Sequence, residues 1–172
     1  MREKLQHFFN IGNGSADNYV LLGDGITSLT EEFNPESESK HYIHMASASN
    51  KVKSYAPSIS VEKEYIQDED LQDWINEKIK VLPTGYEAQS DYIRINILEG
   101  ADDSGNYPAV KRPCTYQFDS IGGDAGDVIM NKMTLAGNGD PIQGTFNVKT
   151  RTFTPATQTT QTTQTTQTTQ TT

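Results

Sequence analysis

The stretch SISVEKEY, residues 58–65, alternates apolar and polar side chains. Ile59 and Val61, followed by Lys63 or Tyr65, occupy every second position, and serine and glutamate stand between them. A second stretch, YIRINI at residues 92–97, places isoleucine at every second position. Successive side chains of a strand point to opposite faces, so both stretches predict β-strands with one buried face.

The rest of the chain repeats this organisation. Further candidate strands are residues 18–22, 40–46, 51–55, 110–120, 127–136 and 142–149. Turns rich in Gly, Asp and Asn separate several of them, at residues 23–25, 102–106, 122–126 and 137–140. We therefore expect a mainly β fold, an antiparallel β-barrel or sandwich.

One segment, at about residues 68–80, has a helical period instead. Its apolar residues share one face, acids gather in its first turns and lysines in its last, and Pro83 with Gly85 follows. Asp68 is the expected N-cap. The predicted core anchors of this single flanking helix are Leu71, Trp74, Ile75 and Ile79.

A polar region with few apolar residues lies between residues 23 and 57. Two extended segments, 40–46 and 51–55, are joined by Ser47-Ala48-Ser49-Asn50 and predict a hairpin arm at about residues 38–57. A lone two-stranded ribbon is marginal in water, so we expect the arm to pack on another subunit. The arm residues expected to make that contact are Lys40, Tyr42, His44, Lys51, Lys53 and Tyr55.

Composition divides the 172 residues into a β domain, 1–154, and a Thr/Gln-rich tract, 155–172. The tract is expected to be disordered, with a polar β-rich segment or a tether as alternatives. The formal charge of −9 opposes nucleic-acid binding, because phosphate recognition needs Lys and Arg. No apolar run reaches the ~20 residues of a membrane span. One cysteine and no signal-like N-terminus are consistent with assembly in a reducing cytoplasm.

No catalytic constellation stands out. His41 and His44 are three apart in an expected strand, which puts their side chains on opposite faces, and no P-loop, G-x-S-x-G or H-E-x-x-H motif occurs. Cys114 lies in a strand-like run and is expected to be buried. The Asp-rich turns lack EF-hand spacing, and turn chemistry explains them. We expect a protein that is not an enzyme and needs no cofactor or metal.

Three blocks of sequence, taken in order, resemble the tail tube (major tail) proteins of phages that infect Gram-positive bacteria. They are residues 54–65, residues 70–75, and residues 119–126 with 137–146. The resemblance covers roughly residues 1–150 and leaves out the Thr/Gln tract. It implies a β-barrel or sandwich with one flanking helix, assembled into hexameric rings that stack into a tube, with a long hairpin bridging the rings.

The resemblance also implies partners and a place. The lumen of such a tube encloses the tape-measure protein and then conducts DNA, while terminator and initiator or baseplate proteins close the ends. The protein would belong to the virion tail and assemble in the host cytoplasm. An acidic wall would repel the phosphates of passing DNA. The candidate lumen acids are Glu31, Glu32, Glu36, Glu38, Glu62 and Glu64, although the sequence does not decide which face their strands present.

Two other functions stay open. One is the tube protein of a contractile particle, such as a bacteriocin or injection system. The other is a carbohydrate-binding β-sandwich in which exposed tyrosines stack on sugars, the candidates being Tyr86, Tyr92, Tyr107 and Tyr116. Aromatic residues in strands more often pack across the sheet.

Overall fold

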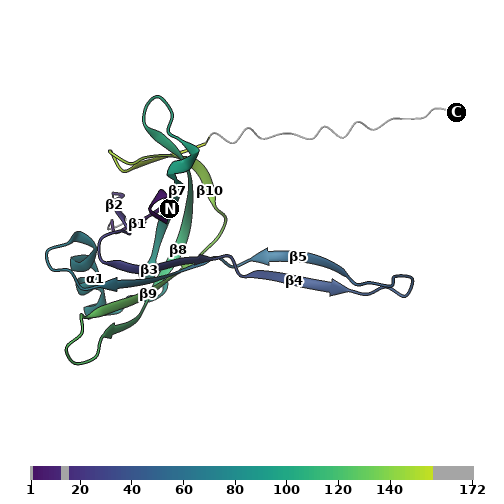
Figure 1. Cartoon of the computed structure of the whole chain (residues 1–172), viewed down its shortest axis with the longest axis horizontal. Helices are drawn as coiled ribbons and strands as arrows, with labels where there is room; N and C mark the ends of the chain where they lie inside the picture. The colour runs from purple at the N-terminus through teal and green to yellow at the C-terminus, as the bar shows by residue number, and fades with distance from the viewer. Residues whose placement is uncertain (1, 13–15, 157–172) are drawn as a thin grey trace.

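The computed structural model describes residues 2–12 and 16–156 as a mainly antiparallel β protein with one α-helix (Figure 1). The predicted fold class is confirmed. The Thr/Gln tract from residue 157 onward lies outside the described residues. The strands are β1 (Leu5–Asn10), β2 (Tyr19–Leu21), β3 (Ile26–Glu32), β4 (Pro35–Lys40), β5 (Ser49–Tyr55), β6 (Ser58–Glu64), β7 (Gln89–Asn96), β8 (Asn106–Gly122), β9 (Met130–Gly137), β10 (Ile142–Asn147) and β11 (Thr152–Pro155). The helix is α1 (Asp70–Val81), and short 3-10 turns are η1 (Arg2–Lys4), η2 (Gly85–Ala88) and η3 (Ile97–Glu99).

In the described part of the chain nine strands form one sheet in the order β2-β1-β7-β8-β9-β6-β3, and β10 joins β8 to β11. The long strand β8 links the two halves of this sheet. Its residues 109–115 pair with β7, residues 106–111 pair with β10, and residues 114–122 pair with β9. β8, β9, β6 and β3 therefore make a four-stranded half, and β4 with β5 form a separate hairpin.

Two apolar clusters hold the body together. The larger lies between the two halves of the sheet and α1, and contains Phe9, Ile59, Trp74, Tyr116 and Leu135 among others. The smaller lies on the opposite face of β1 and β7, where Phe8 and Ile93 pack on Phe146 of β10. The Phe9 and Trp74 rings meet edge to face at 5.2 Å, which adds to the gain from burial.

The prediction of a single buried face is therefore wrong for residues 92–97. Ile93 and Ile95 are buried in the smaller cluster, but Tyr92 is equally buried on the other face, in the larger one. β7 lies between two cores because β10 and β11 fold back beneath it. Residues 58–64 follow the predicted alternation, with Ile59, Val61 and Lys63 buried.

Helix α1 packs as its apolar period predicts. Leu71, Trp74 and Ile75 are buried, and Ile79 is partly buried against the same cluster. The helix begins one residue later than predicted: Glu69, not Asp68, is the N-cap, and Asp68 has a φ of 60°. Glu69 is held there by its carboxylate, which lies 2.6 Å from the ammonium group of the buried Lys63. No helix among the described residues is long and apolar enough to cross a membrane.

Five of the six further candidate strands correspond to β2, β5, β8, β9 and β10. Within the described residues, four strands have no counterpart among the sequence predictions: β1, β3, β4 and β11. β1 carries two adjacent phenylalanines because both of its faces are buried, and this removes the alternation that marks a half-buried strand.

Candidate assembly surface

The arm, residues 35–55, is exposed along almost its whole length. It projects away from the body, on the side opposite α1 (Figure 1). Among the strands of the described residues, β4 and β5 pair only with each other, and every residue of β5 is exposed. A ribbon with both faces in solvent buries no core of its own, and it therefore needs a partner to become rigid.

The structure corrects the boundaries of this hairpin. The strands are residues 35–40 and 49–55, so the predicted strand at 40–46 is wrong: residues 41–48 form the connecting loop. The first strand, PESESK, is polar and contains proline, and such a composition reads as a loop. It becomes a strand by pairing with the more β-prone SNKVKSY.

The six predicted contact residues all lie on this hairpin. Lys40 ends β4, Tyr42 and His44 stack their rings at 6.0 Å in the loop, and Lys51, Lys53 and Tyr55 lie on β5. Each is exposed. Exposed apolar side chains accompany them, with Ile43 fully exposed and Val52 at 47%. No contact with another subunit is tested by this structure, and their role stays a prediction.

A polar face covers the outer side of the four-stranded half. Opposite Ile59 and Val61, which point into the core, β6 presents Glu62 and Glu64. Paired positions share a face, so Glu32 of β3, opposite Ser58, joins them. Asp119 accepts a hydrogen bond from Thr134 Oγ1 on this face, and Lys132 contacts Glu62 at 2.6 Å. Four carboxylates thus share the face with one ammonium group.

Glu31 does not belong to this face. It pairs with Ile59 and points inward, where its side chain is only 8% exposed. Its carboxylate accepts hydrogen bonds from Arg94 at 2.8 Å and from the Tyr92 hydroxyl at 3.1 Å, and lies 3.4 Å from His7 Nε2. The prediction that Glu31 is a lumen acid is therefore wrong. Glu31 and Glu32 are neighbours in one strand, so only one of them can face outward.

Glu36 and Glu38 are not on the polar face either. Both belong to β4 of the arm. Glu36 accepts a hydrogen bond from Ser54 Oγ, and Glu38 lies 3.3 Å from Lys40 and 3.5 Å from Lys53. The sequence pattern does not identify Asp119 and Lys132 as residues of the polar face. Once β8 and β9 are paired with β6, the alternation of each strand identifies them.

Both edges of the four-stranded half are free in the described chain. β3 pairs with β6 on one side only. Residues 116–122 of β8 pair with β9, while the pairing with β7 on the other side ends at Thr115. Unpaired backbone N–H and C=O groups on such edges are a template for another strand.

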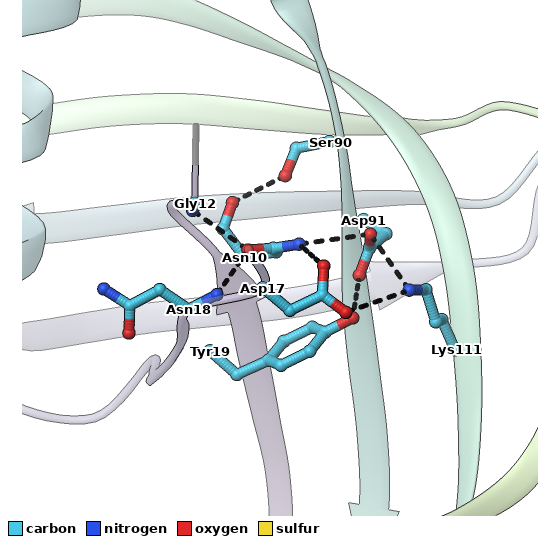
Figure 2. Close-up of polar contacts among 8 residues, drawn as sticks. All are labelled: Asn10, Gly12, Asp17, Asn18, Tyr19, Ser90, Asp91 and Lys111. Atoms are coloured by element: carbon cyan, nitrogen blue, oxygen red, sulfur yellow. Dashed lines mark hydrogen bonds and ion pairs between the residues drawn. The ribbon is translucent and has the colours of Figure 1, made fainter. Parts of the chain in front are cut away.

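A network of hydrogen bonds holds the other half rigid (Figure 2). The Asn10 side chain accepts from the backbone N–H of Gly12 and Asn18, and donates to Asp17 and Asp91. The Tyr19 hydroxyl donates to Asp91 at 2.5 Å, and Lys111 pairs with Asp91 at 3.2 Å. Burial, with the adjacent Asp91 charge, raises the pKa of Tyr19 far above its usual value, so its hydroxyl stays protonated. These groups tie the end of β1 and the start of β2 to β7 and β8.

Three of the four tyrosines proposed to stack on sugars are buried or partly buried. Tyr92 is 1% and Tyr116 4% exposed, and Tyr107 packs against the smaller cluster. Only Tyr86 of the four is fully accessible, at 90%. A set of stacking aromatic rings is therefore absent from these four positions.

Neither protein-family models nor curated protein sequences give a match. Solved structures do. The tail of an empty GTA particle, refined with C6 symmetry, matches with a TM-score of 0.56 and 14% identity over 81% of this chain and 94% of that one.

Two further structures agree with it. The SPP1 tail tube matches with a TM-score of 0.59 and 11% identity, over 83% of this chain and 77% of that one. A chain of the native gene transfer agent virion matches with a TM-score of 0.54 and 12% identity, over 81% and 94%. This chain thus shares its fold with chains of the SPP1 tail tube and of the GTA particle tail.

Proposed function

We propose that this chain is a structural subunit of a phage tail tube, in which six copies form a ring and the rings stack. The observation that carries the proposal is the four-stranded half of the sheet, which has two free edges and one polar, acidic face. The shared fold with tail structures supports it. We propose no enzymatic activity and no cofactor for this protein.

Strand directions make the two edges complementary. The four strands are antiparallel at each step, so the edge strands β3 and β8 run in opposite directions. When copies are related by rotation about the tube axis, each strand keeps its direction relative to that axis. β3 of one copy would therefore meet β8 of the next as an antiparallel pair, and heterologous pairing of this kind closes into a ring.

The acidic face suits the inside of such a ring. Glu32, Glu62, Glu64 and Asp119 outnumber Lys132, so a wall made from this face is anionic. An anionic wall repels DNA phosphates and lets the duplex slide. The proposed partners are the tape-measure protein, a terminator and an initiator or baseplate complex. We propose that the protein belongs to the virion of a phage with a Gram-positive host and that it assembles in the host cytoplasm.

A pair of cysteines tests the ring. Thr30, Ser60, Thr134 and Gln117 form one row across the four strands and all lie on the polar face. Three strand spacings of ~4.8 Å separate Thr30 from Gln117 within one chain, too far for a disulfide. In a ring the two positions of neighbouring copies come together. We expect Thr30→Cys with Gln117→Cys to give, on oxidation, a covalent ladder that ends at six chains.

Each single cysteine variant is the matched control and should give no ladder beyond two chains. Negative-stain microscopy of the untagged protein supplies the second readout, with rings or hollow tubes expected. Dispersed monomers in the microscope, together with no ladder, would refute the proposed function.

A further inference from the structure

The outer part of the arm has a charge opposite to that of the rest of the chain. Ser37 pairs with Val52 and Glu38 with Lys51, so this outer part is residues 37–53, which contain three lysines and one acidic residue, Glu38. Its net charge is +2 although Glu38 lies within 3.5 Å of Lys40 and Lys53, and the other residues carry −11, against −9 for the whole chain. The same segment exposes Tyr42, Ile43 and Val52. A ribbon that is both cationic and apolar fits a surface that is acidic and apolar.

The structure contains such a surface, at the opposite end of the four-stranded half. We call it the β8–β9 tip, residues 121–130. At the arm end of the sheet the paired residues are Glu32, Ser58 and Ala136. At the other end Glu64 pairs with Met130, and Met130 with Gly122. The arm and the β8–β9 tip therefore leave the sheet in opposite directions.

The β8–β9 tip has the complementary chemistry. Ile121, Val128 and Ile129 are 50%, 58% and 48% exposed, although they belong to a hairpin well tied to the body. The Tyr65 amide donates to the Ile129 carbonyl at 2.8 Å. Asp124 and Asp127 are exposed beside them, and no lysine or arginine occurs between residues 119 and 131.

We propose that the β8–β9 tip is the docking site for the arm of a second copy of this chain in the adjacent ring. This rests on the proposed function, which stacks rings head to tail. A copy displaced along the strand direction brings its arm toward the β8–β9 tip of its neighbour, since the two lie at opposite ends of one sheet. Lys51 and Lys53 then face Asp124 and Asp127, and Tyr42 and Ile43 of the arm loop cover the exposed aliphatic side chains of the tip.

A charge swap tests the pairing. Lys51→Glu with Lys53→Glu should lower the yield of sedimentable tubes about tenfold at low salt, with rings still forming through the sheet edges. Adding Asp124→Lys with Asp127→Lys should restore the tubes. The matched control adds Asp73→Lys with Glu77→Lys on α1, exposed acids outside the tip, and should restore nothing.

A cross-link provides a readout that does not depend on charge. Ile43→Cys in the arm loop, combined with Val128→Cys, should form disulfides between copies in assembled tubes, because the two positions lie at opposite ends of one chain and cannot meet within it. Cys114 is buried and should not interfere. The Thr30–Gln117 ladder described above reports ring formation independently.

Three results would overturn the docking site. If tubes form but show neither the Ile43–Val128 cross-link nor rescue by the tip variants, the docking site is refuted while the ring and the tube stand. Rescue by the α1 variants would move the site to the helix. Wild-type protein that forms neither rings nor the Thr30–Gln117 ladder would refute the proposed function, and the docking site with it.

Discussion

The Glu31 carboxylate lies 2.8 Å from the Arg94 guanidinium and ties the edge strand β3 to β7 across the interior. The same guanidinium lies 5.7 Å from the centre of the Phe33 ring, at the root of the arm. Asn34 then turns the chain with a φ of 43° and donates from its side chain to the Ala56 carbonyl. This ion pair therefore positions both an edge expected to pair in the ring and the arm expected to join rings.

The first prediction concerns acid stability. Burial would raise the pKa of Glu31, but the His7 hydrogen bond and the Arg94 charge outweigh burial and lower the pKa to about 2. The folded pKa is thus below the ordinary value of 4.5, so the stabilisation is complete above that value and is lost as the pH falls toward 2. Glu31→Gln should lower the free energy of unfolding at pH 7 by about 2–3 kcal/mol.

Urea unfolding at several pH values measures this effect. The variant should also lose part of the decline in stability between about pH 4.5 and pH 2. Glu36→Gln, an exposed carboxylate on the arm, is the control and should change stability by less than about 0.5 kcal/mol. Equal effects of the two substitutions would contradict the buried network.

A second prediction concerns the buried ammonium group of Lys63, which is 1% exposed and pairs with Glu69 at 2.6 Å. Glu69→Gln leaves that charge without its partner and should cost about 3 kcal/mol. Lys63→Met removes the charge and keeps the side-chain length, so its stability should lie within about 1 kcal/mol of the wild type. Thermal unfolding of both variants checks the asymmetry, and a larger loss for Lys63→Met would contradict it.

The single cysteine offers a probe of the core. Burial, helped by the Asp91 charge, raises the pKa of the Cys114 thiol to about 12, and the residue is 1% exposed. At pH 8 a thiol reagent should leave the native protein unmodified and should react fully once denaturant unfolds it. Val52→Cys on the arm should react at once in the folded protein. Fast labelling of native Cys114 would show that the core opens near it.

Charge reversal on the polar face should change how assembled tubes treat DNA. Glu32→Lys with Glu64→Lys replaces two of its four carboxylates and should make tubes retain duplex DNA at low salt, with release as salt rises. Glu77→Lys with Glu87→Lys, outside this face, is the matched control. A co-sedimentation assay measures retention. Equal retention by both variants would place the polar face outside the lumen.

Removing the arm should separate stacking from folding. A short turn in place of residues 36–54 deletes side chains that contribute no residue to either apolar cluster. The body should keep its melting temperature within a few degrees, while tubes are lost and rings remain. Microscopy and thermal unfolding give the two readouts, and long tubes from the deleted protein would refute the role of the arm.

The sequence predicts the buried side chains best in β6 and α1. The alternation from Ile59 to Lys63 predicts which side chains are buried, and the helical period predicts the packing of Leu71, Trp74 and Ile75. Both patterns are local consequences of backbone geometry, with periods of 2 and 3.6 residues. The same geometry requires Glu31 and Glu32 to face opposite sides.

The sequence by itself thus determined the mainly β class, the single helix, the protruding ribbon and the negative charge, because each follows from neighbouring residues or composition. Tertiary structure alone decided that Glu31 is buried, that β7 lies between two cores, and that β3 and the outer part of β8 are left as opposite edges. These features depend on which distant strands pair, and strand pairing is set by packing of the whole body rather than by any local pattern.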